Sequence, residues 1–226
     1  MLAFYNDAKI KEKYLARVKA HADADEIIQG EYWEGGKGCA IGCISHQDGQ
    51  EDAIEYLEKY LSFPSHLTLL VESIFEGLEN IDAKDFPVNV IEKTPVGKDL
   101  SLIIPKFSVW LLVDKKDGVI NLVDEKPVVQ DVADLYLRVI SGDQVTCDEW
   151  RVAYESAYDA AARVASSAAY AAAYAAAYAA ADAAADAAYA DAYAAAYAAY
   201  NAADAAADAA YARVKQKNKL LELLGE

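Results

Sequence analysis

The carboxyl-terminal third of this chain contains no residue that would normally end or turn a helix. Between Gly142 and Gly225 there is neither glycine nor proline, and alanine, the strongest helix former, dominates the stretch. Thr146-Cys147-Asp148-Glu149 has the S/T-x-x-E form of a capping box, so a helix should begin at Cys147. We predict one helix from about residue 147 to residue 224, roughly 115 Å long if it stays unbroken.

Tyrosine and aspartate interrupt the alanine at a fixed period. Tyr178, Tyr189, Tyr200 and Tyr211 are each eleven residues apart, and this hendecad repeat places them in one stripe along a helix. Because an isolated helix of this kind would expose tyrosine rings and methyl groups, we expect it to pair with another helix, either from a second chain in a homo-oligomer or from the same chain folded back. The predicted assembly residues are Tyr170, Tyr174, Tyr178, Tyr189, Tyr193, Tyr197, Tyr200 and Tyr211.

The composition divides the chain into two parts. Residues 1–146 have an ordinary globular mixture of aliphatic, aromatic and charged side chains, whereas alanine prevails from residue 147 onward. We predict a helical head over 1–146 and an assembly element over 147–226. Near the end of that element Arg213, Lys215, Lys217 and Lys219 would complement the helix dipole.

The head is predicted to be all-α. Apolar residues at helical spacing, together with capping and proline signals, indicate helices with Ser65 as an N-cap and a kink or break at Pro105. Val119–Val123 favours a short strand, which leaves a minor β element as an alternative. The predicted helices are Asp7–Ala24, Gln50–Leu61, Ser65–Leu78, Lys98–Val113 and Pro127–Ile140.

The chain is strongly acidic, with a formal net charge of −16. Residues 151–226 hold nine acidic and six basic side chains, so most of this charge lies in the head. Such a field disfavours direct binding to nucleic acid or to an anionic membrane and favours a basic partner. No apolar run reaches the length of about 20 residues that a membrane span needs, and three cysteines without a signal pattern indicate the cytoplasm.

One glycine-rich stretch carries the residues with the most chemistry. It reads Tyr-Trp-Glu-Gly-Gly-Lys-Gly-Cys over residues 32–39, and a loop of this type can direct backbone amides at an anion. Lys37 would add charge and an aromatic ring would stack on a base, which suits a nucleotide-like ligand, although no Walker motif is present. The predicted ligand-binding residues are Tyr32, Trp33, Lys37, Gly38 and Cys39.

Cys39 also raises two alternatives. A thiol near a helix amino terminus and a lysine would have a lowered pKa, so a cysteine-dependent enzyme that uses Cys39 is one reading. Cys39, Cys43 and His46 could instead bind a metal, with Cys147 or His21 as a fourth ligand. That spacing matches no familiar zinc pattern, so we expect neither a metal nor a cofactor.

The aspartates of the tail suggest a DNA mimic. Two pairs, Asp182/Asp186 and Asp204/Asp208, recur after 22 residues, which is about 33 Å of helix and close to one turn of duplex. The charge is much sparser than that of DNA phosphates. An inhibitor of a nucleic-acid-binding protein is therefore an alternative function rather than the leading one.

Three segments of the head resemble a group of phage, prophage and bacterial proteins that have no assigned function. They are GGKGCAIGCISH (35–46), a GKGCAxGC-type loop, FPSHLTLLVESIFEGL (63–78) and PVGKDLSLIIPKFSVWLLVDKKDGV (95–119). The resemblance implies a mobile-element context, where small acidic proteins act by binding and blocking a host factor. We therefore expect a non-enzymatic counter-defence protein in the host cytoplasm that captures a basic host protein or a nucleotide-like ligand.

Overall fold

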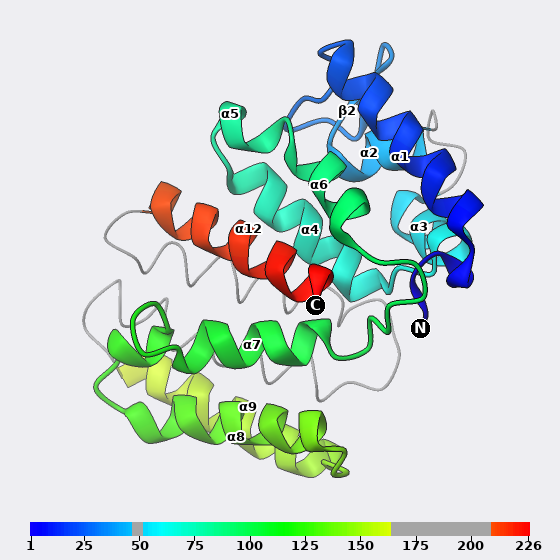
Figure 1. Cartoon of the computed structure of the whole chain (residues 1–226). Helices are drawn as coiled ribbons and strands as arrows, with labels where there is room; N and C mark the ends of the chain where they lie inside the picture. The colour runs from blue at the N-terminus through cyan, green and yellow to red at the C-terminus, as the bar shows by residue number, and fades with distance from the viewer. Residues whose placement is uncertain (47–51, 164–208) are drawn as a thin grey trace. The chain divides into compact units, whose positions relative to one another are not determined.

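Where the structure describes it, the chain folds mainly into helices, with one small two-stranded sheet (Figure 1). The computed structural model describes residues 1–46, 52–163 and 209–226. Two compact units are distinguished. Unit 1 combines Met1–Ile103 with Lys217–Glu226, and unit 2 comprises Ile104–Gln216. Unit 1 is therefore discontinuous in sequence, because unit 2 is inserted between its two segments.

Unit 1 contains most of the described helices. The 3-10 helix η1 (Ala3–Asn6) leads into α1, and the sheet lies between α1 and α2 along the chain. The carboxyl-terminal part of α12 (Ala209–Gly225) completes the unit. Its other elements are α1 (Ala8–Asp23), β1 (Trp33–Glu34), β2 (Lys37–Gly38), α2 (Ala40–Ser45), α3 (Ala53–Leu61), α4 (Ser65–Gly77), α5 (Asn80–Ala83) and α6 (Phe86–Lys93).

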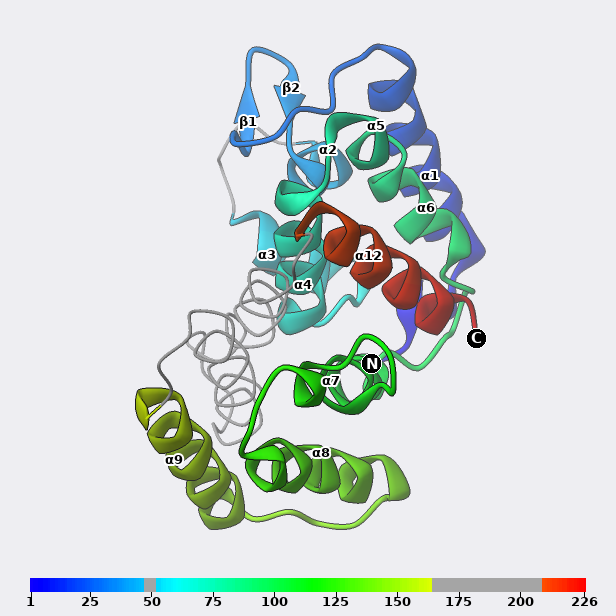
Figure 2. The same cartoon turned by 90° about the vertical axis from the view of Figure 1, so that its left-hand side faces the viewer.

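The short helix α2 lies at the centre of unit 1. It contacts α1, α3, α4, α6 and β2, and each of its six residues is buried. Figure 2 shows the two strands side by side next to this helix. The core around it is apolar, with Ile41 and Ile44 of α2 fully enclosed together with Leu57 and Leu67 of the neighbouring helices. The glycine-rich stretch is thus anchored on one side by the core.

Local signals explain where several helices begin. The Asp7 side chain accepts a hydrogen bond from the Lys9 amide, and α1 occupies Ala8–Asp23, which confirms the predicted helix. Asp52 caps α3 in the same way. The prediction for Ser65 was wrong in one respect: it is the first helical residue after Pro64, and its hydroxyl donates to Glu58 instead of capping α4.

Unit 2 contains α7 (Ile103–Val113), η2 (Val119–Asn121), α8 (Lys126–Ser141) and α9 (Cys147–Arg163). Pro105 falls in the first turn of α7, where its missing N–H leaves no bond unmade, so it starts the helix and does not kink it. The strand considered for Val119–Val123 is wrong, because this segment forms the 3-10 turn η2. The minor β element lies instead at β1 and β2.

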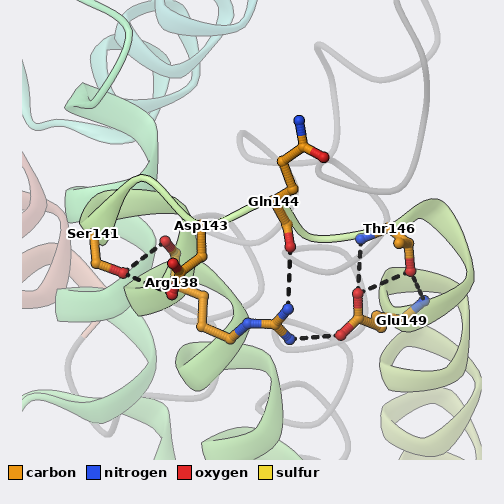
Figure 3. A network of polar contacts seen from close by, with 6 residues as sticks. All are labelled: Arg138, Ser141, Asp143, Gln144, Thr146 and Glu149. Atoms are coloured by element: carbon orange, nitrogen blue, oxygen red, sulfur yellow. Dashed lines mark hydrogen bonds and ion pairs between the residues drawn. The ribbon is translucent and has the colours of Figure 1, made fainter.

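The capping box at the start of α9 is confirmed (Figure 3). The Glu149 amide donates to Thr146 Oγ1 at 3.3 Å, and the Thr146 amide donates back to Glu149 Oε2 at 2.8 Å. Arg138 of α8 donates to Glu149 Oε1 at 2.6 Å and to the Gln144 carbonyl at 3.1 Å. The same carboxylate therefore caps α9 and ties it to α8. Beside it, Tyr136 and Trp150 pack with ring centroids 4.9 Å apart.

The long helix predicted over 147–224 is not confirmed. Its two ends are helical, as α9 and α12, but residues 164–208 lie outside the described residues. The boundaries of the two units, after Ile103 and after Gln216, also differ from the change of composition at residue 147. An assembly element over 147–226 accordingly stays a prediction.

Candidate functional site at the glycine-rich hairpin

The glycine-rich stretch forms a two-stranded hairpin. Trp33 pairs with Gly38 and Glu34 pairs with Lys37. Gly35 and Gly36 make the turn with φ values of 57° and 89°, a conformation that glycine adopts without strain. The sequence predicts that these glycines belong to a ligand-binding loop, and in the structure they close this turn.

Two further glycines allow a close approach of the backbone. A Cβ atom on Gly38 would lie 2.4 Å from the Tyr32 carbonyl oxygen, and one on Gly42 would lie 1.8 Å from the same atom. Neither position has room for a side chain. The glycine content of this segment is thus largely explained by packing, without a ligand.

The backbone amides at the base of the hairpin are engaged within the protein. The Gly38 amide donates to the Glu26 carbonyl at 3.0 Å, and the Cys39 amide donates to the Glu31 carbonyl at 2.9 Å. These are two of the groups that would have been directed at an anion. An anion at this hairpin would have to be held by other groups, of which Lys37 is the exposed cation.

The five predicted ligand-binding residues do not converge on one point. Tyr32 and Lys37 are exposed together with Glu34, and we call these three side chains the outer face of the hairpin. Trp33 is half-buried on the inner side, as alternation along a strand requires. Gly38 and Cys39 are buried.

The inner side of the hairpin meets a pair of histidines. His21 of α1 shares a 2.7 Å hydrogen bond between its Nε2 and Nδ1 of His46, and its own Nδ1 lies 2.6 Å from Glu26 Oε2. Trp33 packs edge-on against both imidazoles, with ring centroids 5.3 Å and 5.0 Å away. Partial burial lowers the pKa of His46, and the neighbouring His21 and Arg17 lower it further. This cluster fixes the hairpin to α1 and to the end of α2.

Both cysteines of the segment are kept protonated. Cys39 is 1 % exposed, and burial raises its pKa strongly, with a further contribution from Glu72. Burial raises the pKa of Cys43 to about 12, and its thiol donates to the Gly38 carbonyl. A nucleophilic cysteine needs a thiolate, so these surroundings do not favour an enzyme that uses Cys39.

Cys39 has two neighbours that the sequence reasoning missed. The thiol of Cys39 and one carboxylate oxygen each of Glu72 and Glu76 all lie within 4.8 Å of one another. In the described part of the chain, Cys39, Cys43 and His46 are not brought together at such distances. Glu72 and Glu76 are four residues apart on α4, and this spacing within the predicted helix was the signal that could have pointed to a carboxylate pair.

Most predicted assembly residues lie outside the described residues. Only Tyr211 is described; it is 55 % exposed at the start of α12, and Lys215 Nζ lies 4.2 Å from its ring centroid. The aspartates of the proposed DNA mimic, from Asp182 to Asp208, also lie outside the described residues. The remaining assembly residues, likewise outside, are Tyr170, Tyr174, Tyr178, Tyr189, Tyr193, Tyr197 and Tyr200.

Comparison of the chain with protein-family models, with curated proteins and with solved structures found no match. Among the described residues, no helix combines the length and the apolar character needed to cross a membrane.

Proposed function

We propose that the protein is a non-enzymatic binding protein whose outer hairpin face captures a partner protein. The observation that carries the proposal is Tyr32, which is 49 % exposed beside Glu34 and Lys37 on a hairpin whose inner side is fixed. Tyrosine is enriched at protein interfaces because it offers a large contact area and a polar tip. The role remains the counter-defence inhibition of a host factor that the sequence resemblance implies.

A protein partner is favoured over a nucleotide for two reasons. The Gly38 and Cys39 amides, which would have held a phosphate, donate to protein carbonyls. Trp33 packs on His21 and His46, so it does not share a face with Tyr32 to enclose a base. The chain's net charge of −16 favours a partner with a basic surface.

Photo-crosslinking inside bacterial cells tests this proposal. A benzophenone amino acid is placed at Tyr32 and, as a matched control, at Ile81, which is 81 % exposed on α5. We expect one discrete adduct from position 32, absent from position 81 and weakened by Lys37→Ala. Equal adducts from both positions, or no adduct from position 32, would refute a binding surface here.

Small-molecule capture has its own readout. The purified protein is denatured and its extract analysed by mass spectrometry for a released compound. We expect no stoichiometric nucleotide. A nucleotide that is present in the wild type and lost in Lys37→Ala would replace the partner protein with a ligand-sequestration function.

We also propose that the chain assembles through its tyrosine stripe. The support is the eleven-residue repeat of Tyr178, Tyr189 and Tyr200. Light scattering on the full chain should give an oligomer, and replacement of these three residues with alanine should shift it toward a monomer. An unchanged mass would contradict this role for the stripe.

A further inference from the structure

We propose that Cys39, Glu72 and Glu76 form a binding site for a divalent metal ion of the zinc class. The site lies in unit 1, between the start of α2 and one face of α4. It is separate from the outer hairpin face and independent of partner capture.

The geometry supplies three ligands of suitable type. The Sγ atom of Cys39 and the carboxylate oxygens of Glu72 and Glu76 lie within 4.8 Å of one another. With Zn–S near 2.3 Å and Zn–O near 2.0–2.2 Å, ligand atoms around a tetrahedral zinc stand about 3.3–3.8 Å apart. A contraction of about 1 Å is therefore enough, and Glu76, which is exposed, can supply it by a side-chain rotation.

The backbone around the site is fixed on both sides. The Cys39 amide donates to the Glu31 carbonyl at 2.9 Å, whereas the Gly30 amide bonds only the Glu76 side chain, at 2.9 Å, a contact that the rotation of Glu76 would give up. Helix α4 holds the two glutamates one turn apart, on the same face. The three ligands are thus presented by elements that do not have to refold on binding.

Among the described residues, no lysine or arginine balances the charge at the site. The groups that shift the pKa of Glu72 are the Cys39 thiol, the Glu76 carboxyl and the Ile41 amide, in addition to burial. Those that shift the pKa of Glu76 are the Gly30 amide and Glu72, again after burial. No lysine or arginine of the described residues is among them. A bound metal ion would therefore neutralise two carboxylates that have no basic partner among the described residues.

The ligand set selects a class of ion. A thiolate prefers zinc, cobalt and similar ions, whereas magnesium and calcium prefer oxygen ligands alone. Three protein ligands leave a fourth tetrahedral position for water. On binding, the S–H bond of Cys39 breaks, a sulfur–metal bond forms, and the thiol proton passes to the buffer.

Cobalt titration tests the proposal with a readout specific to sulfur. Co²⁺ is added to the chelator-treated full chain, and the thiolate-to-cobalt charge-transfer band is followed in the near-ultraviolet. We expect a band that saturates at one equivalent and disappears when Zn²⁺ is added. No band, or one that saturates only with several equivalents, would overturn the proposal.

Variants assign the ligands. Cys39→Ser should abolish the band, and Cys147→Ser, which removes an exposed thiol, should leave it unchanged. If Cys39→Ser does not fold, Glu76→Gln decides: because Glu76 is exposed, the fold should persist, and cobalt affinity should fall about tenfold or more. Glu12→Gln removes the same charge from an exposed position on α1 and should leave cobalt affinity unchanged. Equal affinity of the Glu76→Gln and Glu12→Gln variants would refute the site.

Discussion

At the scale of single residues, Cys39 shows how burial reverses a sequence-based expectation. A lysine two positions away and a helix start just after it predicted a reactive thiolate. The structure encloses the thiol and places the Glu72 carboxyl beside it, and both changes stabilise the protonated form. Lys37, by contrast, is exposed and is not among the groups that shift the pKa of Cys39.

Alkylation rates should reflect this environment. At neutral pH, iodoacetamide should modify the exposed Cys147 first and Cys39 much more slowly. The reagent reacts only with a thiolate that it can reach, and Cys39 is buried and protonated. Peptide mapping by mass spectrometry over a time course gives both rates in one sample. Modification of Cys39 ahead of Cys147 would revive the cysteine-enzyme alternative.

Glu72 should make the stability of unit 1 depend on pH. Burial is the main cause that raises its pKa from an ordinary value of 4.5 to about 7. Between pH 4.5 and pH 7 the folded state therefore keeps a proton on Glu72 that the unfolded state has lost. The stabilisation is fully present below pH 4.5 and is lost as the pH rises through 7. Glu72→Gln should remove this part of the pH dependence of stability. The lowered pKa of His46 has the opposite effect, since it makes the folded state more stable as the pH rises.

The measurement needs a probe of unit 1 alone. Trp33 is the tryptophan of unit 1, since Trp110 and Trp150 belong to unit 2 and can be replaced with phenylalanine. Urea midpoints followed by Trp33 fluorescence at pH 5 and pH 8, in a chelator, then compare wild type with Glu72→Gln. An identical pH dependence in the two proteins would contradict the shifted pKa.

At the scale of elements, the hairpin depends on a glycine that lies outside it. Gly42→Ala in α2 would place a methyl group 1.8 Å from the Tyr32 carbonyl, so strand or helix must move. We expect the free energy of unfolding to fall by about 1–3 kcal/mol or more, measured by urea unfolding followed through Trp33 fluorescence. Gly35→Asn is the matched control, because position 35 has open space and a φ of 57° that asparagine accepts. Equal stability of the two variants would contradict the close packing.

The capping box at the start of α9 makes a second prediction for an element. Thr146→Ala removes the hydroxyl that accepts from the Glu149 amide, and should destabilise unit 2 by about 1 kcal/mol. Trp150, 3 % exposed against Tyr136, reports unfolding when Trp33 and Trp110 are replaced. Asp148→Asn alters the same turn without touching the cap and should cost less. The reverse order would show that helix-dipole charge, rather than the cap, stabilises this end.

These elements also show which features can be predicted from a sequence. The capping box at Thr146 is predicted correctly because its partner, Glu149, lies three residues along the chain. The hairpin and the Cys39 neighbourhood were missed because they depend on partners far away: the Tyr32 carbonyl explains Gly42, and α4 brings Glu72 to Cys39. The identity of a glycine or a cysteine does not tell whether it lies in a ligand-binding loop or in a packed core, and only the fold distinguishes these two environments.

At the scale of the whole molecule, the last residues of the chain belong to the same unit as most of the predicted head. The lysines predicted to complement a helix dipole form specific ion pairs, Lys215 with Asp117 in unit 2 and Lys217 with Asp82 in unit 1. The residues after them belong to unit 1, although the rest of that unit ends at Ile103. The chain must therefore return to unit 1 after completing unit 2, and the last ten residues contribute to its core.

The leucines of this last segment should be essential to unit 1. Leu220 and Leu224 are fully buried in α12, and truncation of such a side chain to alanine removes apolar contact and leaves a cavity. We expect Leu224→Ala to lower the free energy of unfolding of unit 1 by about 2–5 kcal/mol, measured through Trp33 fluorescence in urea. Glu222→Ala, on the exposed side of the same turn, should have little effect. If Leu224→Ala leaves the Trp33 transition unchanged, the carboxyl-terminal segment is dispensable for unit 1, and its fold must be complete within residues 1–103.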